Sequence, residues 1–216
     1  RSRKVKPGTA RRELGVLQAA LNHAHSEGVL IHPIKVELPA ASETRDRWLT
    51  RSEADALLSA SAPHMQRFIL LSLYTGRRMS AILDLTWTRV DLDAGFIRFA
   101  DGAETKKRRG RIRVPKQLRE HMQGWEDGAT HVVNFRGKKI QSVKTATRRA
   151  GERAGVDGVT PHVLKHTAIT WAVMDGLDVE DAAEYFDTSP ETIRKHYWHH
   201  SPRHQERAIS IIEARK

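Results

Sequence analysis

A tyrosine close to the C-terminal end of the chain, Tyr197, lies within a strongly basic stretch. A phenol oxygen can act as a nucleophile that forms a covalent intermediate, and cationic neighbours suit an attack on a phosphate. Ile193 lies four residues earlier, so the two side chains would also share one face of a helix packed on the core. Taken alone, the stretch favours this packing role. The basic neighbours of the tyrosine are Arg194, Lys195, His196, His199 and His200.

Two further groups of cationic residues could bind an anion. Arg77 and Arg78 follow directly after an apolar segment. An arginine pair at such a place is either solvated or positioned to grip an anion. His162, Lys165 and His166 are spaced i, i+3 and i+4, so one side of a helix would carry all three. The order along the chain is thus an arginine pair, a histidine-bearing helix and the tyrosine.

A basic run between residues 106 and 111 forms another group. Short alternating segments at 96–99 and 111–114 flank it and predict two strands. A basic hairpin of this kind can lie in a DNA groove or along a DNA backbone. The alternative is a charged turn in solvent.

The composition is that of an ordinary globular protein with a large basic excess. The 216 residues carry 37 Lys and Arg against 26 Asp and Glu, a formal net charge of +11. That excess indicates a polyanionic partner, with nucleic acid ahead of an anionic membrane surface. The chain has no cysteine, which excludes disulfides, thiolate metal sites and cysteine nucleophiles. It shows no apolar run of membrane-spanning length and no signal peptide, and its start at Arg1 without a methionine leads us to expect a fragment.

Caps and apolar spacings predict mostly helices. Thr50 begins a capping box that opens a helix to about residue 60, and Pro63 opens another that ends at Gly76. Thr160 and Ser189, each followed by proline, cap two later helices. Further helices are predicted at 9–27, near 82–85, and at 115–123, 141–153, 178–186 and 203–216, with a linker at 29–48 and a third strand at 131–134. This is a mainly α fold with a small antiparallel β-sheet (α+β).

Three strings of the chain resemble the tyrosine recombinase (phage integrase) family. They are Leu73-Tyr74-Thr75-Gly76-Arg77-Arg78, Thr160-Pro161-His162-Val163-Leu164-Lys165-His166-Thr167, and Ser189-Pro190-Glu191-Thr192 leading to Tyr197. Any one of them alone would be weak, but they agree in order and spacing over residues 47–200. The resemblance implies the tyrosine-recombinase catalytic-domain fold over 47–216. It also implies that residues 1–46 are the C-terminal end of the helical core-binding domain plus a linker.

The resemblance also implies a mechanism. Family members cut a DNA strand by attack of a tyrosine oxygen on a phosphodiester, and the 3′-phosphotyrosyl link retains the bond energy, so no cofactor is expected. Tyr197 would be the nucleophile, Arg78 the first phosphate-binding arginine, and His162 the general acid/base or phosphate donor. A hairpin lysine would protonate the 5′-oxygen leaving group. Lys106 fits the family context best, and Lys107 is second.

Three positions depart from the family pattern. The second arginine, three residues after the histidine, is Lys165, which keeps the charge and loses the planar fork. The late histidine or tryptophan, ten residues before the tyrosine, is Asp187, whose carboxylate would repel a phosphate unless it is turned away or paired. The usual acidic residue three after the first arginine is Ala81. The nucleophile, the first arginine and the histidine are unaffected.

The implied function is site-specific recombination by a bacterial, cytoplasmic, DNA-associated integrase. Its partners would be duplex DNA attachment sites, further copies of itself in a tetramer, and accessory DNA-bending or directionality proteins, with no membrane. A DNA-binding paralogue with weakened catalysis and a topoisomerase of the same chemistry are the alternatives. No metal is expected, because the late histidines have no acidic partner at ligand spacing. The DNA-binding residues would be Lys107, Arg108, Arg109, Arg111, Lys144, Arg148 and Arg149.

The last segment of the chain is expected to be an amphipathic helix. Ala208, Ile211 and Ile212 would form its apolar stripe after a break at Ser201-Pro202. Members of the resembling family commonly exchange such a segment between protomers. Packing on the same chain is an equal alternative.

Overall fold

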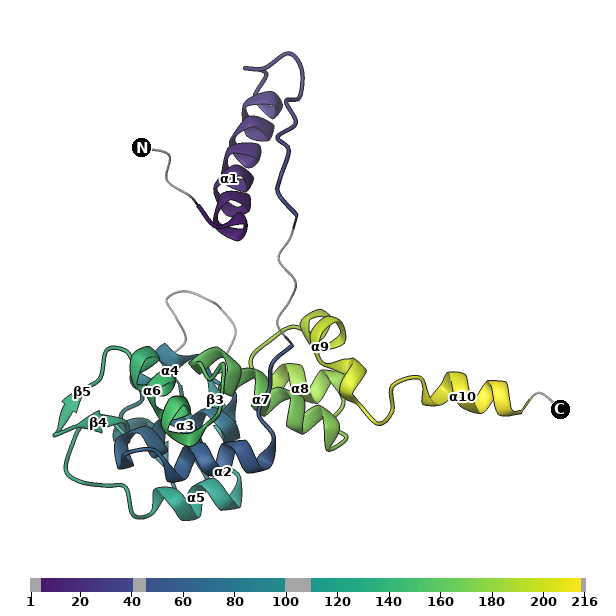
Figure 1. Cartoon of the computed structure of the whole chain (residues 1–216). Coiled ribbons are helices and arrows are strands. Elements are labelled where there is room, and N and C mark those ends of the chain that lie inside the picture. The colour runs from purple at the N-terminus through teal and green to yellow at the C-terminus, as the bar shows by residue number, and fades with distance from the viewer. Residues whose placement is uncertain (1–4, 41–45, 100–109, 215–216) are drawn as a thin grey trace. The chain divides into compact units, whose positions relative to one another are not determined.

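The computed structural model describes residues 5–40, 46–99 and 110–214 (Figure 1). The chain divides into two compact units, Arg1–Asp46 and Arg47–Lys216. The described part of the first unit contains α1 (Pro7–Ser26), none of whose residues is buried. Among the described residues, no helix combines the length and the apolar character needed to cross a membrane.

The second unit is built mainly from helices, with two small sheets. Its α-helices are α2 (Arg51–Ser59), α3 (Pro63–Thr75), α4 (Met79–Leu83), α5 (Lys116–Met122), α6 (Lys144–Ala154), α7 (Pro161–Met174), α8 (Val179–Tyr185), α9 (Pro190–His196) and α10 (Glu206–Glu213). Its strands are β1 (Val90–Asp91), β2 (Phe96–Arg98), β3 (Arg111–Arg113), β4 (Asn134–Phe135) and β5 (Lys138–Lys139), and its 3-10 turns are η1 (Trp87–Arg89) and η2 (Trp198–His200).

Helices α3 and α7 pack against each other at the centre of this unit. Phe68, Ile69 and Leu71 of α3 are fully buried, as expected for a helix that is apolar on most sides. The hydroxyl of Thr160 caps α7 by accepting a hydrogen bond of 3.1 Å from the Val163 N–H. Local capping therefore fixes where α7 begins, and burial holds it against α3.

Strands β1, β2 and β3 form an antiparallel sheet in that order. Ile97 of β2 lies opposite Ile112 of β3, and both side chains are buried in the core. The flanking residues Arg111 and Arg113 are exposed. The predicted mainly α fold with a small antiparallel sheet is confirmed.

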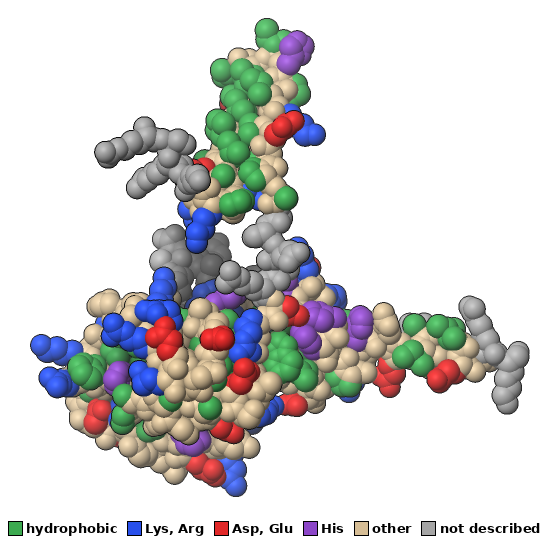
Figure 2. All heavy atoms as spheres, viewed as in Figure 1, with side chains coloured by type: hydrophobic (Ala, Val, Ile, Leu, Met, Phe, Trp, Pro, Cys, Tyr) green, Lys and Arg blue, Asp and Glu red, His purple; other side chains and the backbone are tan. Residues whose placement is uncertain are grey.

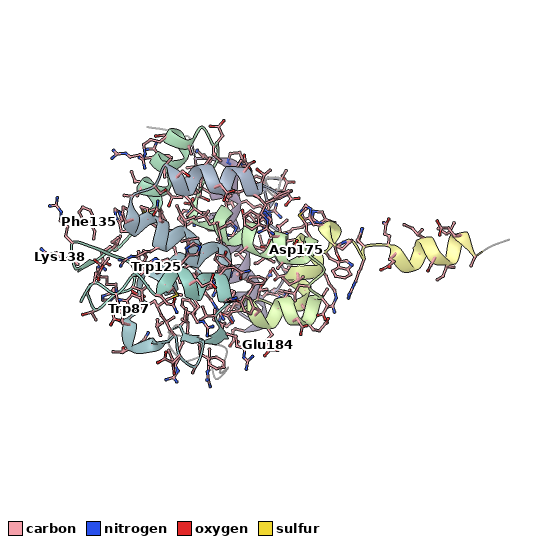
Figure 3. The ribbon with its side chains drawn as sticks, turned by 90° about the horizontal axis from the view of Figure 1, so that it is seen from below. Trp87, Trp125, Phe135, Lys138, Asp175 and Glu184 are labelled. Atoms are coloured by element: carbon pink, nitrogen blue, oxygen red, sulfur yellow. The ribbon has the colours of Figure 1, made fainter. Side chains whose placement is uncertain are left out.

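A second pair of strands differs from the prediction. The predicted strand at 131–134 is instead an isolated bridge between Thr86 and His131, followed by the β4–β5 hairpin. Figure 3 shows Phe135 and Lys138 on this hairpin, and half of Phe135 is exposed. The sequence analysis missed it because two-residue strands carry no detectable alternation.

The segment around the tyrosine also differs. Helix α9 ends at His196, so Tyr197 is the residue that follows the helix rather than a member of it, and η2 comes next. A separate apolar cluster joins α7, α8 and α9. It contains Ile169, Phe186, Ile193 and Tyr197.

Candidate active site

The turn after α3 separates the two arginines. Gly76 ends the helix with a φ of 56°, a left-handed conformation that glycine adopts without strain. A Cβ at this position would lie 2.5 Å from the Phe186 ring, so the close approach also requires glycine. Beyond the turn, Arg77 is buried, whereas the Arg78 side chain is 72% exposed. The chain thus directs one arginine into the protein and the other outward.

The first turns of α7 carry the histidine and the lysine. His162 is exposed, and Lys165 is half-buried one turn later. The amino end of a helix carries partial positive charge, so an anion beside these residues would also be stabilised by the helix itself. Helix α7 therefore supplies two basic side chains and, from the backbone at its amino end, a positive electrostatic potential.

A cavity of about 740 Å³ brings these residues together. Arg78 lines it from the turn before α4, and His162 and Lys165 line it from α7. The first half of α6 contributes Lys144 and Arg148, both exposed. Five groups that are cationic or can become so face one cavity, which is an arrangement suited to a phosphate.

The residues that follow α8 contact the cations of the site. Asp187 Oδ2 lies 3.4 Å from Arg77 Nη1 and 3.8 Å from Arg78 Nη1. Lys165 Nζ donates a hydrogen bond of 3.4 Å to the Phe186 carbonyl. The Asp187 carboxylate is therefore paired with arginines, which is one of the two conditions that the sequence set for an acidic residue here.

The charge of Lys165 is sensitive to these neighbours. Burial lowers its pKa, and the positive charges of Arg78 and Arg77 lower it further, while Asp187 raises it; the resulting pKa is about 8. Lys165 is thus mostly charged at pH 7. A bound phosphate would favour the charged form and raise the pKa.

Tyr197 does not belong to the described residues that line the cavity. It is buried, with 6% of its surface exposed. Its ring lies 4.8 Å from the ring of His166, centroid to centroid, at an angle of 53°. Since His166 is one helical turn beyond His162 on α7, the tyrosine lies next to the helix that carries the site, with its ring packed in the apolar cluster.

The remaining predicted DNA-binding residues and the predicted catalytic lysine do not all fall among the residues that line the cavity. Lys106, Lys107, Arg108 and Arg109 lie outside the described residues. Arg111 is exposed, and its guanidinium lies 3.7 Å from the centroid of a phenylalanine ring on β2. On α6, Arg149 is exposed, and Arg148 forms an ion pair with Glu152. Figure 2 shows Lys and Arg side chains gathered over the part of the second unit that contains α6 and the β4–β5 hairpin.

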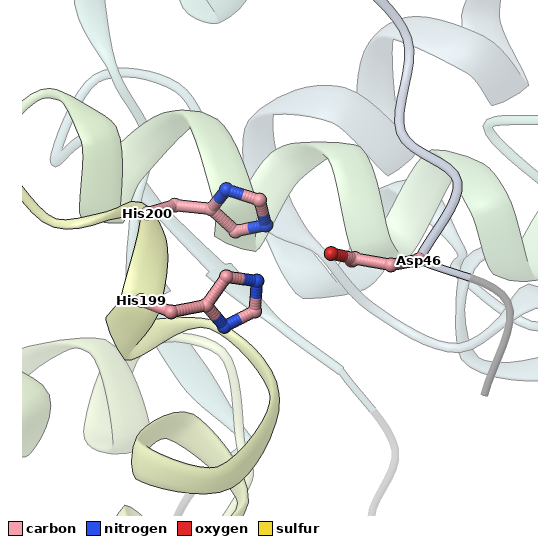
Figure 4. A group of neighbouring side chains, drawn as sticks. All are labelled: Asp46, His199 and His200. Atoms are coloured by element: carbon pink, nitrogen blue, oxygen red, sulfur yellow. The ribbon is translucent and has the colours of Figure 1, made fainter. Parts of the chain in front are cut away.

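The late histidines form a ring pair next to the tyrosine. The centroids of His199 and His200 lie 4.0 Å apart on η2 (Figure 4). Asp46, also drawn in Figure 4, belongs to the first unit. Two imidazoles offer fewer ligands than the four of a structural zinc site.

Two residues of this region were named in the sequence analysis among the cationic groups but were not assigned a role in the site. Arg77 is the buried partner of Asp187, and His166 is the ring on which Tyr197 packs. Each lies close in the sequence to a predicted site residue. The resemblance assigned roles to Arg78 and His162, but no local pattern showed that Arg77 and His166 would be the residues that point inward.

Comparison with known proteins identifies the family. The model of the phage integrase family matches residues 47–204. The tyrosine recombinase XerA of Thermococcus kodakarensis is 30% identical in an alignment of 193 positions that covers 83% of this chain and 67% of the relative.

Two solved structures show the same fold. One is the Tn1549 transposon integrase in complex with a circular intermediate DNA, with a TM-score of 0.76, 18% identity, and coverage of 98% of this chain and 81% of that one. The other is a lambda integrase tetramer bound to a Holliday junction, with a TM-score of 0.66, 18% identity, and coverage of 85% and 57%. The family model over most of the chain, together with the XerA similarity, confirms the resemblance seen in the sequence: this protein belongs to the phage integrase family, the tyrosine recombinases.

Proposed function

We propose that this chain cuts and rejoins DNA strands through a 3′-phosphotyrosyl intermediate on Tyr197. The observation that carries the proposal is the shared cavity of Arg78, His162 and Lys165 at the amino end of α7. A phosphodiester there would contact a fixed guanidinium, an ammonium and an imidazole. Positioned charge of this kind stabilises the anionic transition state of phosphoryl transfer.

The proposed step conserves atoms and charge. The Tyr197 oxygen forms a bond to phosphorus while the bond from phosphorus to the 5′-oxygen breaks. The phenol proton passes to a base, for which His162 is the candidate, and the 5′-oxygen takes up a proton from Lys106 or Lys107. The reverse reaction with another 5′-hydroxyl rejoins the strand, so no cofactor takes part.

The proposal includes a movement of the tyrosine. Tyr197 is buried against His166 and does not line the cavity, so we propose that the segment carrying it moves to bring its hydroxyl to the phosphate. The segment that carries it is short, since α9 has seven residues. Asp187, at a positive φ of 51°, separates α9 from α8 and is a natural place for such a movement.

Duplex DNA is the proposed partner. The support is the net charge of +11, the exposed basic residues of α6, and the DNA to which both structural neighbours are bound. We also propose that residues 1–46 are the end of a core-binding domain that clamps DNA together with 47–216.

A tetramer on DNA is the proposed assembly. Helix α10 exposes Ile209, Ile211 and Ile212, each by half or more (Figure 2). An apolar face of this kind suits docking on a neighbouring protomer. The lambda integrase neighbour forms a tetramer on a Holliday junction, which supports the same assembly here.

A covalent-adduct assay tests the central proposal. The protein is incubated with a pool of nicked duplexes of random sequence, in which the released 5′-hydroxyl fragment diffuses away and cannot be religated. We expect a species on a denaturing gel that carries both protein and labelled DNA. Binding of the pool without any adduct would reject the proposed cleavage and leave a DNA-binding role.

A further inference from the structure

The end of α8 places negative and partly negative groups beside the cations of the site. Asp187 follows the helix in the left-handed conformation, and the Thr188 N–H donates a hydrogen bond of 3.0 Å to the Ala183 carbonyl. This is the usual helix end in which glycine or asparagine takes the left-handed position. Here the position holds an aspartate, whose negative charge is unfavourable beside the negative end of a helix.

Three cations compensate for this unfavourable placement. Arg77 donates to the Tyr185 carbonyl at 3.3 Å, and Lys165 donates to the Phe186 carbonyl at 3.4 Å. The Asp187 carboxylate adds ion pairs to Arg77 and Arg78, and both pairs use the same oxygen, Oδ2.

The two arginines are held differently. Arg77 is 4% exposed and has the shorter contact, so its pair with Asp187 is little screened by solvent. Arg78 is 72% exposed, has the longer contact of 3.8 Å, and faces the cavity. An incoming anion can therefore take over Arg78 at little cost, whereas Arg77 retains the shorter and more buried pair with the carboxylate.

We infer that Asp187 is a positioning residue whose carboxylate occupies the place of the phosphate near Arg78. In the absence of DNA, the carboxylate holds Arg78 at the cavity. When a phosphate binds, Arg78 pairs with the phosphate instead, and the carboxylate remains paired with Arg77. The inference rests on the proposed function, because it takes the cavity to be the phosphate site. Asp187 itself touches no substrate in this arrangement. The sequence predicts that a carboxylate here would repel a phosphate unless it is turned away or paired, and the pairs with Arg77 and Arg78 meet the second condition.

The same carboxylate tunes the neighbouring lysine. Burial and the two arginines lower the pKa of Lys165, and Asp187 counteracts them. A carboxylate that served only as a counter-ion for Arg77 would not exchange with an anion at Arg78, so an anion bound in the cavity would leave the contact between Asp187 and Arg78 unchanged. A stand-in anion would compete with the ligand, and its removal would strengthen anion binding.

Asp187→Asn is the sharpest variant, because asparagine tolerates the left-handed conformation and has the same size. Asp93→Asn is the matched control, since it makes the same charge change at an exposed position in the β1–β2 turn. Inorganic phosphate is the probe. Its binding is followed by NMR of the arginine Nε and lysine Nζ groups in the chain of 216 residues, with Arg77, Arg78 and Lys165 assigned by substitution.

We expect Asp187→Asn to bind phosphate several-fold more tightly than the wild type, and Asp93→Asn to leave the affinity near the wild-type value. We also expect Lys165 to titrate at lower pH in Asp187→Asn. An affinity that is unchanged or weaker in Asp187→Asn, or that rises equally in the control, would overturn the inference.

A second measurement needs no variant of Asp187 to fold. In the wild type, phosphate is expected to shift the Nε resonance of Arg78 and to leave that of Arg77 in place. A shift of the Arg77 resonance alone, or equal shifts of both resonances, would show that Arg78 does not exchange the carboxylate for the phosphate. Neither measurement depends on strand cleavage, so a failure of the covalent-adduct assay is distinguishable from a failure of this inference.

Discussion

The rings of His166 and Tyr197 pack against each other, with centroids 4.8 Å apart. Tyr197→Phe removes the hydroxyl and retains the packing of the ring. We expect this variant to form no covalent adduct with nicked DNA and to bind duplex DNA with nearly unchanged affinity, because the nucleophile is removed and little else. Denaturing gels measure the adduct, and a mobility-shift titration measures binding.

Tyr185→Phe is the matched control for this change. Its hydroxyl donates a hydrogen bond of 3.1 Å to the Tyr74 carbonyl, so the variant should lose about 1 kcal/mol of folding free energy and still form the adduct. An adduct in Tyr197→Phe at the wild-type level would show that another residue is the nucleophile.

Cleavage is expected to depend on pH through Lys165. Its pKa in the folded protein is about 8, so the side chain is charged below that value and becomes neutral as the pH rises through it. Single-turnover cleavage by the wild type should therefore fall on the alkaline side of pH 8, with the fall displaced upward when bound phosphate raises the pKa. Lys165→Arg should remove this fall and cleave at least as fast at pH 7, because arginine stays charged and binds phosphate in a bidentate manner.

The pH dependence of the free energy of unfolding gives an independent check on the pKa of Lys165. The folded-state pKa of Lys165 lies below its ordinary value of 10.5, so between about 8 and 10.5 the unfolded chain binds more protons than the folded one. This group therefore makes the protein more stable as the pH rises through that window. The rise should be absent in Lys165→Arg, and an unchanged curve in the variant would argue against the lowered pKa.

Gly76→Ala should destabilise the protein strongly. A Cβ there would lie 2.5 Å from the Phe186 ring, and the φ of 56° is strained for alanine, so we expect a decrease in the free energy of unfolding of about 2 kcal/mol or more. Gly155→Ala has a similar φ of 66° with no atom within 4 Å of the new Cβ, and should be destabilised by about 1 kcal/mol. Urea unfolding measures both. Equal decreases would mean that the clash with Phe186 is easily relieved.

DNA binding should be weak and steeply dependent on salt. Replacement of Lys144 and Arg148 by alanine should lower the affinity for duplexes of any sequence, because both side chains line the cavity. The slope of log K against log salt should become shallower by about 0.9 for each phosphate that is no longer neutralised. Lys116→Ala is the control, since this exposed lysine is paired with Glu120 on α5, away from the cavity. Equal slopes of log K against log salt in the wild type, the α6 variant and the control would show that α6 does not contact the DNA backbone.

Glutamate at Ile212 should block assembly on DNA without affecting the binding of one protomer. Ile212 is 63% exposed on α10 and would be covered by a neighbour in the proposed tetramer. Ser210→Glu adds the same charge on the opposite side of the same helix and should assemble normally. Analytical ultracentrifugation of the DNA complexes distinguishes the outcomes. Normal assembly of Ile212→Glu would exclude this face from the protomer interface.

Short-range patterns in the sequence were sufficient for most elements of the fold. The capping box of Thr50 and Glu53 opens α2, the hydroxyl of Thr160 caps α7, and Ser189 caps α9, as predicted. Each of these caps joins residues three apart, so the chain forms them locally and the sequence displays them directly. The three sequence strings typical of the tyrosine recombinase family could be recognised for the same reason, because each is a continuous stretch of a few residues.

Only the tertiary structure decided which way neighbouring residues point. Arg77 and Arg78 are adjacent and chemically identical, and only the family resemblance singled out Arg78; the turn at Gly76 buries the first and exposes the second. The pairing of Arg77 with Asp187 spans more than a hundred residues and exists because α3, α7 and α8 pack together. Side-chain direction and charge compensation across such distances depend on the summed packing of the core, which no local pattern encodes.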